Sequence, residues 1–335
     1  PRGEATDRTR PPAGCADAIE AERAVRFRRS GSGLFAPSSR SSAETMAEFL
    51  QYLFSGITVG ATYALVGLGF AMIYNASHVI NFAQGEFLMI GGMMTVSMLG
   101  AGVPMPLAIV AAIVLATVVG LALEKFAVEP AKNAKVVTVI IITIGASIFL
   151  RGLAQVVWGK EYHALPPFSG DTPISIGGAT ILPQSLWVLG VTVVVVVALA
   201  WFFNRTLMGK AILATSHNRD AAQLVGINTG LVLLISFGLS AALGAIAGIM
   251  IAPITLTSYD VGIMLGLKGF VAAVLGGLGS GVGAILGGLI LGITEAMAAG
   301  YISSEYKDAV PFVLILLILF FLPNGLFGVR GTERV

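Results

Sequence analysis

The sequence predicts an all-α polytopic membrane protein with about eight to nine embedded helices, two of them short and paired in a glycine-rich hairpin. Of its 335 residues, 56% are hydrophobic and only 11% are charged, whereas soluble domains carry about 25% charged residues. The mean hydropathy of +0.88 and repeated apolar runs of membrane-spanning length indicate lipid as the solvent. This composition excludes a soluble enzyme, and the net charge of +2 indicates no nucleic-acid partner.

Residues 1–45 differ in composition from the rest of the chain. They hold eight arginines, six acidic residues and the only cysteine, Cys15, and they show no helical or strand periodicity. They lack the apolar core of a signal peptide, and a cytosolic or targeting arm is the alternative interpretation. The first methionine, Met46, closely precedes the first apolar run. We therefore expect a non-native or disordered leader over 1–45 and a transmembrane domain over 46–335.

Six apolar runs of 18 to 26 residues approach or exceed the length that a helix needs to cross a membrane. They cover 49–74, 82–99, 105–128, 136–158, 184–203 and 231–253. The second run is interrupted by Gln84 and Glu86, the fourth carries Arg151 near one end, and the fifth is rich in valine. The polar segment 159–182 contains Gly, Pro and Asp, which predicts a sizeable loop.

The remaining segments complete the predicted topology. The segment 205–228 lies between the fifth and sixth runs and holds four ionisable residues and a histidine, so it is too polar to span. The glycine-dense stretch 267–299 is too long for one helix and is broken at 279–281, which predicts two short helices in a hairpin. The last span covers 309–322 and ends at Pro323.

The distribution of Lys and Arg predicts the orientation of the chain in the membrane. Placing 205–228 in the cytoplasm puts eight basic residues inside and four outside, as the positive-inside rule favours. This orientation places the N-terminal side of the first span outside and the C-terminus in the cytoplasm. It requires the pair of helices at 267–299 to enter and leave on the same side.

The cytoplasmic loop 205–228 ends in a short amphipathic segment with a polar start and an apolar face. Its residues of interest are Asn218, Arg219, Asp220, Ala221, Ala222, Leu224, Val225 and Gly226. The glycine suits the C-terminus of a helix. Such a helix can lie on the lipid interface or dock into a groove of a soluble partner, and the residues themselves leave both interpretations open.

Polar residues within the apolar runs are candidates for a path across the membrane. They are Asn81, Gln84, Gly85 and Glu86 at the start of the second run, and Glu295 in the glycine-rich stretch. Acids inside a membrane are costly and therefore indicate function, and Gly85 permits a broken helix that exposes backbone to a cavity. Alternatively, Glu86 is solvated at the headgroup boundary and Glu295 forms a structural pair with Lys268.

The spacing of the glycines and the absence of ATP-binding, metal-binding and hydrolase motifs further limit the class of protein. Gly279, Gly283 and Gly287, like Gly288 and Gly292, recur four residues apart, which is typical of helices packed closely through small residues. The sequence contains no GxxxxGK[ST] motif, so we do not expect the chain to bind ATP through a P-loop. It has no HExxH motif or Ser-His-Asp arrangement, and its three histidines show no metal spacing, so we expect no metal, cofactor or hydrolase activity.

Four segments together resemble one known family. The segments VINFAQGEFLMIGG (79–92), ATSHNRDAAQLVGIN (214–228), LKGFVAAVLGGLGSGVGAILGGLILG (267–292) and LPNGLFG (322–328) are similar to the LivH-type permease of bacterial branched-chain amino-acid ABC importers. The resemblance extends over 46–335 with its motifs in the same order, which makes it more specific than any single glycine motif. It does not cover 1–45.

The resemblance implies a multi-pass permease subunit of the bacterial inner membrane that carries branched-chain amino acids. It implies that ATP is bound by two partner ATPase subunits, and that a second homologous permease and a periplasmic or extracytoplasmic substrate-binding protein complete the importer. It further implies that the helix at 218–228 contacts the ATPase and transmits its motion to the path between the permeases.

Two other functions compete with this interpretation. A secondary transporter driven by an ion gradient should show inverted repeats, paired broken helices and intramembrane acids, for which Glu86 and Glu295 are candidates. An ABC permease for a sugar, nucleoside, urea or amide would share the topology, and the segment NFAQGE (81–86) is the main feature that argues against the sugar and nucleoside members.

Overall fold

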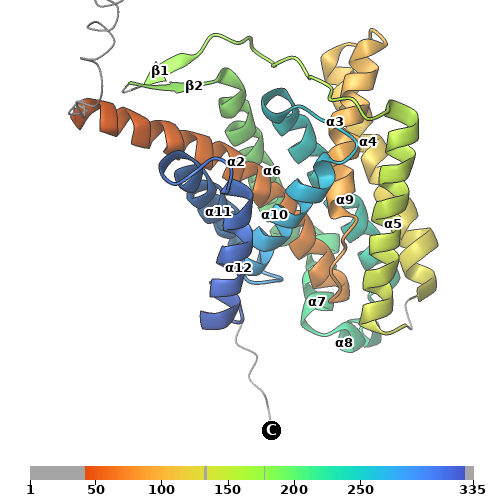
Figure 1. The fold of residues 1–335 in the computed structure, drawn as a ribbon. Coiled ribbons are helices and arrows are strands. Elements are labelled where there is room, and N and C mark those ends of the chain that lie inside the picture. Colours follow the sequence, from red (N-terminus) through yellow and green to blue (C-terminus); the bar gives the residue numbers. More distant parts are fainter. Residues whose placement is uncertain (1–41, 132–133, 177, 329–335) are drawn as a thin grey trace, which may run out of the picture. The chain divides into compact units, whose positions relative to one another are not determined.

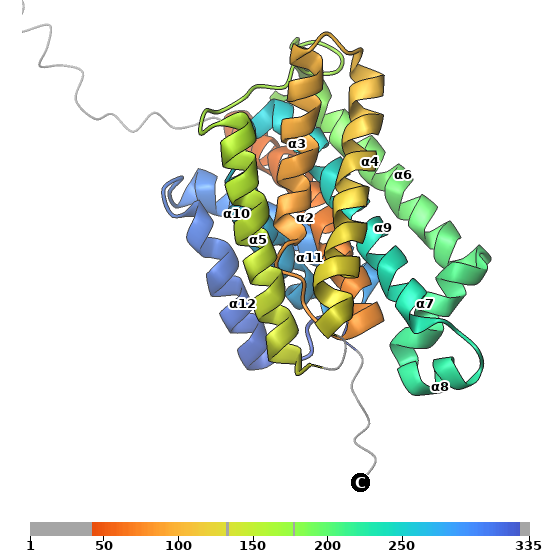
Figure 2. The same ribbon diagram turned by 90° about the vertical axis from the view of Figure 1, so that its right-hand side faces the viewer.

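A computed structural model describes residues 42–131, 134–176 and 178–328. Contacts divide the chain after Thr45, and Met46–Val335 forms one unit, which is seen from two directions in Figures 1 and 2. Apart from its last four positions, the predicted leader 1–45 lies outside the described residues, as does the C-terminal segment 329–335.

The described chain is built almost wholly of helices, as the sequence predicts. The helices are α2 (Ser42–Ser77), α3 (Gln84–Gly100), α4 (Met105–Leu123), α5 (Val136–Trp158), α6 (Pro183–Arg205), α7 (Leu207–His217), α8 (Arg219–Leu224), α9 (Thr229–Thr255), α10 (Val261–Gly276), α11 (Gly281–Tyr301) and α12 (Val310–Phe321). A π-helix at Glu124–Val128 and a 3-10 turn at Glu129–Ala131 extend α4, and a 3-10 turn at Lys307–Ala309 precedes α12.

Within the described residues, six helices are long and apolar enough to cross a membrane, namely α2, α4, α5, α6, α9 and α11. Helices α3, α10 and α12 are shorter, with 17, 16 and 12 residues. Together these nine helices match the predicted polytopic fold. The predicted loop 159–182 contains a small antiparallel hairpin of β1 (Ile174–Ile176) and β2 (Ala179–Ile181), in which Ile174 lies opposite Ile181.

Burial separates the central helices of the unit from the peripheral ones. In their most apolar windows, α2 and α9 are 89% and 72% buried, whereas α5 and α6 are each 11% buried. Helix α3 packs against α4, α9 and α10. Because α5 and α6 are apolar on their exposed sides as well, those sides suit lipid or another membrane subunit rather than water.

The two ends of the helical bundle carry different elements (Figures 1 and 2). The β1–β2 hairpin lies at one end, which we call the hairpin end. Helices α7 and α8 lie at the opposite end, which we call the α8 end. Backbone hydrogen bonds between His163 and Thr257 tie the loop before β1 to the segment between α9 and α10, so α10 begins at the hairpin end.

The glycine-rich hairpin is longer than the sequence predicts. It comprises α10 and α11 joined at 277–280, and α11, with 21 residues, is long enough to span. Asn75 Nδ2 donates to the Gly279 carbonyl at 2.8 Å, which fixes the turn beside the last turns of α2. Tyr301, the last residue of α11, packs edge-on against Tyr52 near the start of α2. The hairpin therefore enters and leaves at the same end, as the predicted topology requires.

Four of the five predicted packing glycines lie in helix contacts. A Cβ at Gly283 would meet the Gly276 carbonyl of α10, one at Gly287 the Ala272 carbonyl, and those at Gly288 and Gly292 the α2 backbone at Ala64 and Gly60. The prediction for Gly279 is wrong, because this residue lies in the turn between α10 and α11 with φ +91°. Its role is to allow the turn, since a side chain there would be strained.

Candidate functional site

The second apolar run forms α3, whose first residues are buried inside the bundle. Helix α2 ends at Ser77 and α3 begins at Gln84, with the non-helical residues 78–83 between them. Asn81 is 1% exposed, and its Oδ1 accepts a hydrogen bond from the Ala83 backbone N–H at 3.0 Å. The helix break that the sequence suggested at Gly85 is not present, because Gly85 lies within α3 and residues 78–83 are the connection between α2 and α3.

Gln84 holds the start of α3 against α9. Its Nε2 donates to the Ser240 carbonyl at 3.0 Å, and its Oε1 accepts from the Ser240 hydroxyl at 2.6 Å. That hydroxyl also lies 2.8 Å from the Gly69 carbonyl of α2. Both polar atoms of the amide are thus paired, which gives Gln84 a structural position. The neighbouring Gly85 allows the backbones of α3 and α10 to touch, because a Cβ there would meet the Gly262 carbonyl.

Glu86 differs from Gln84 because its partners are incomplete. It is 1% exposed, and its Oε1 accepts a hydrogen bond from the Ser147 hydroxyl of α5 at 2.7 Å. Its Oε2 has no hydrogen-bond partner in the part of the chain that the structure describes. Glu86 lies in the first turn of α3, where the helix dipole stabilises a negative charge. It also lines a cavity of about 250 Å³ that includes Arg151. The alternative of a headgroup-solvated Glu86 does not agree with this burial.

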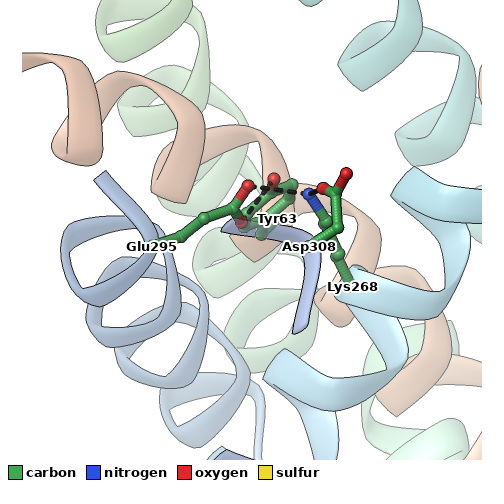
Figure 3. Close-up of polar contacts among 4 residues, drawn as sticks. All are labelled: Tyr63, Lys268, Glu295 and Asp308. Carbon is green, nitrogen blue, oxygen red and sulfur yellow. Dashed lines mark hydrogen bonds and ion pairs between the residues drawn. The ribbon is translucent and has the colours of Figure 1, made fainter. Parts of the chain in front are cut away.

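The other predicted intramembrane acid, Glu295, lies in a separate polar cluster (Figure 3). Its Oε1 lies 2.7 Å from Lys268 Nζ, and its Oε2 accepts from the Tyr63 hydroxyl at 2.9 Å. Lys268 also contacts Asp308 Oδ1 at 2.6 Å. The structural-pair interpretation therefore describes Glu295, and the sequence did not identify Tyr63 and Asp308 as its further partners. Only contact prediction across α2, α10, α11 and the turn before α12 could have found them.

The segment 205–228, in which the sequence predicts the contact with the ATPase, contains two helices rather than one. The sequence suggested a single helix over 218–228 and missed α7, which precedes it. Three polar side chains cap the successive helices at their N-termini: Thr206 for α7, Asn218 for α8 and Asn228 for α9. Such caps satisfy the first free N–H groups of each helix. The expected left-handed stop is present, because Gly226 has φ +90°.

The apolar surface of α8 is narrower than predicted. The apolar face predicted for docking includes Ala222, but Ala222 is only 4% exposed and is buried against the rest of the chain. Leu224 and Val225 are 88% and 78% exposed. Arg219, Asp220 and Ala221 lie in the first turns of α8, and the first two border a polar cavity with Glu124 and Glu129. Two adjacent large apolar side chains are thus exposed at the α8 end, beside charged groups.

Comparisons with known proteins agree with this architecture. The family model described as "Branched-chain amino acid transport system / permease component" matches residues 52–319. The high-affinity branched-chain amino acid transport system permease protein LivH of Escherichia coli K12 is 37% identical over 88% of this chain and 100% of its own length. The corresponding protein BraD of Pseudomonas aeruginosa is 34% identical over 86% of this chain and 98% of its own length.

A more distant relative is named for the import of a different substrate. The autoinducer 2 import system permease protein LsrC of Shigella flexneri is 29% identical over 66% of this chain and 59% of its own length. The family match nevertheless runs from α2 into α12 and includes both the α2–α3 connection and the α7–α8 segment. The chain therefore belongs to the family of permease components of branched-chain amino acid transport systems.

Proposed function

We propose that this protein is the membrane-spanning subunit of an ATP-driven importer that carries branched-chain or related amino acids across the bacterial inner membrane. The observation that carries the proposal is the family match over 52–319, supported by relatives that are named for branched-chain amino acid transport and are aligned over nearly all of their length. In this proposal the subunit forms the path and is not an enzyme, and partner ATPases bind and hydrolyse ATP.

The importer that we propose contains a second homologous permease, two ATPase subunits and an extracytoplasmic substrate-binding protein. The α8 end faces the cytoplasm in this arrangement, because Lys125, Lys135, Arg205, Lys210 and Arg219 all lie toward it and favour the inner side of the membrane. The hairpin end and the N-terminal side of α2 face the periplasm. The exposed apolar sides of α5 and α6 are then available to lipid and to the second permease.

Transport is coupled to ATP through α7 and α8 in this mechanism. Ile212 of α7 and Ala222 of α8 are 1% and 4% exposed, and Gln223 Nε2 donates to the Thr229 hydroxyl of α9 at 2.9 Å. The two short helices are thus packed onto the bundle and not tethered loosely to it. A movement of an ATPase against α8 would be passed to α6 and α9, whose packing must have two arrangements of similar free energy.

Uptake measurements test the proposed function. Cells that express this subunit with its ATPase, permease and binding-protein partners should accumulate labelled leucine, isoleucine or valine, and an ATPase variant that cannot hydrolyse ATP should abolish uptake. Uptake that persists with the inactive ATPase would favour an ion-gradient-driven transporter. Uptake of a sugar, nucleoside, urea or amide in place of these amino acids would favour a different ABC importer.

A pair of variants tests the contact with the ATPase. Leu224→Glu places a charge on the exposed apolar surface of α8 and should prevent co-purification of the ATPase and stop uptake at normal membrane levels of the permease. The matched control is Tyr162→Glu, at a residue that is 71% exposed near the hairpin end, which should leave both unchanged. If Leu224→Glu transports normally with its ATPase bound, α8 serves only as an interfacial anchor.

A further inference from the structure

The cavity beside Glu86 has walls of two chemical kinds. It lies among α2, α3, α5 and α10 and has a volume of about 250 Å³. One part of its lining is charged and consists of Glu86 and Arg151, and the other is apolar and includes Phe82, Phe270 and Ile148. No ion pair within 4.0 Å joins the two charged groups, nor does Arg151 pair with another acid in the described ranges.

One carboxylate oxygen of Glu86, a residue that lines this cavity, has no hydrogen-bond partner among the described residues, which points to a ligand. A buried carboxylate oxygen without a partner is costly, and Glu86 Oε2 is such an atom. The cluster at Glu295 resolves the same problem within the chain, because both carboxylate oxygens there have partners. Glu86 and Arg151 instead line the same cavity as one acidic and one basic residue with no ion pair between them, which matches a ligand that carries both charges.

We propose that this cavity is a transit site for a zwitterionic aliphatic amino acid. Glu86 receives the α-ammonium group, Arg151 receives the α-carboxylate, and the wall that includes Phe82, Phe270 and Ile148 receives the aliphatic side chain. The inference rests on the proposed function and goes beyond it, because it assigns a position and a set of contacts to the substrate inside the permease.

Size and depth agree with this assignment. The cavity volume of about 250 Å³ is several times that needed for one water molecule, so the cavity has room for a small solute such as valine or leucine. Arg151 lies seven residues before the end of α5 at Trp158, which places it about 10 Å along the helix from that end. The cavity lining therefore includes residues that lie within the length of α5 and not at its terminus.

Protection of a cysteine from chemical labelling tests the proposal in membranes that hold the complete transporter. Cys15→Ser removes the native cysteine, and Leu267→Cys introduces one into the cavity lining. Leucine should slow labelling of this cysteine by a methanethiosulfonate reagent roughly tenfold once it is about ten times above its dissociation constant. A cysteine at Thr172, in the exposed loop before β1, is the control and should be labelled at the same rate with and without leucine.

Two analogues and two charge variants separate the roles of the charged groups. Leucinamide lacks the carboxylate and 4-methylpentanoate lacks the ammonium group, so each should protect more weakly than leucine. In Glu86→Gln, leucine and 4-methylpentanoate should become equivalent, and in Arg151→Gln, leucine and leucinamide should become equivalent. Either variant should raise the leucine concentration for half-protection at least about tenfold, whereas the control Glu161→Gln, in an exposed loop, should not.

The outcomes distinguish this proposal from the proposed function. If the wild-type transporter imports leucine but leucine does not slow labelling at Leu267→Cys, the cavity is not a transit site, and the proposed function stands. If leucinamide and 4-methylpentanoate protect as well as leucine, the assignment of the two charges is wrong. If the transporter imports no branched-chain amino acid, the proposed function fails and the cavity proposal fails with it.

Discussion

Replacing Lys268 with methionine tests whether the buried polar cluster of Figure 3 holds α2, α10 and α11 together. The Lys268 and Glu295 side chains are 6% and 9% exposed and lie 2.7 Å apart. Methionine keeps much of the length and volume of lysine but removes its charge. The substitution therefore leaves the Glu295 carboxylate buried, with the Tyr63 hydroxyl as its remaining partner among the described residues.

The contacts predict a graded loss of stability. Removing one partner of a buried ion pair costs about 3–5 kcal/mol, because the other charge stays buried and uncompensated. Tyr63→Phe removes one hydrogen bond to a carboxylate, which contributes about 1.5–3 kcal/mol. Asp308 is 48% exposed, so solvent screens its pair with Lys268, and Asp308→Asn should cost about 0–1 kcal/mol. The expected order of destabilisation is Lys268→Met, then Tyr63→Phe, then Asp308→Asn.

Thermal unfolding of the purified permease in detergent measures this series. At about 2–4 °C per kcal/mol, Lys268→Met should lower the Tm by about 6–20 °C. The control Lys160→Met, in an exposed loop, should change the Tm by no more than about 2 °C. If Lys268→Met unfolds within the range of this control, or if Asp308→Asn is the more damaging variant, the cluster does not stabilise the fold in the way argued.

Three further predictions concern the turn after α8, the helix contacts and the topology. Gly226→Val should cost about 1–3 kcal/mol through backbone strain, seen as a lower Tm, because Gly226 has φ +90° and no neighbouring atom within 4 Å of an added Cβ. Gly292→Ala should cost about 1–3 kcal/mol, because its Cβ would meet the α2 backbone, whereas Gly100→Ala, with nothing within 4 Å, should leave the Tm unchanged or slightly raised. In intact cells, a membrane-impermeant thiol reagent should label a cysteine at Ser169 but not one at Ser216; labelling at Ser216 would reverse the proposed orientation.

Most of the fold could be predicted from the sequence because apolar length is a local property. The predicted ends of the spans agree with α4, α5 and α6 to within a few residues. The turn of the glycine-rich hairpin was displaced by about two residues, and α10 begins six residues earlier than expected. Asp260 is the N-cap residue of α10, but its side chain makes no capping hydrogen bond. The start of α10 instead packs closely against Gly85 of α3.

The candidate sites were less predictable because they depend on contacts between distant segments. The motif at 81–86 indicated a broken helix, but its sequence does not reveal that Gln84 is paired with Ser240 while Glu86 faces a cavity. Likewise, the apolar pattern of α8 could not distinguish the buried Ala222 from the exposed Leu224. In a six-residue helix, the direction of each side chain is set by how the helix is docked, and periodicity carries little information.

The two intramembrane acids show how a structure separates a stabilising charge from one available to a ligand. Glu86 and Glu295 give the same signal in the sequence, since each is a carboxylate within an apolar helix. At Glu295, a lysine and a tyrosine from other helices occupy both oxygens, so further binding there would require existing contacts to be broken. At Glu86, one oxygen accepts a hydrogen bond from Ser147 and the other is buried without a partner among the described residues. The residue lines a cavity that also includes Arg151. A transient binding site needs a group that is already oriented and still has an unpaired atom. The Glu86 carboxylate is such a group, because Ser147 holds it in position and no internal partner has to be released from its second oxygen.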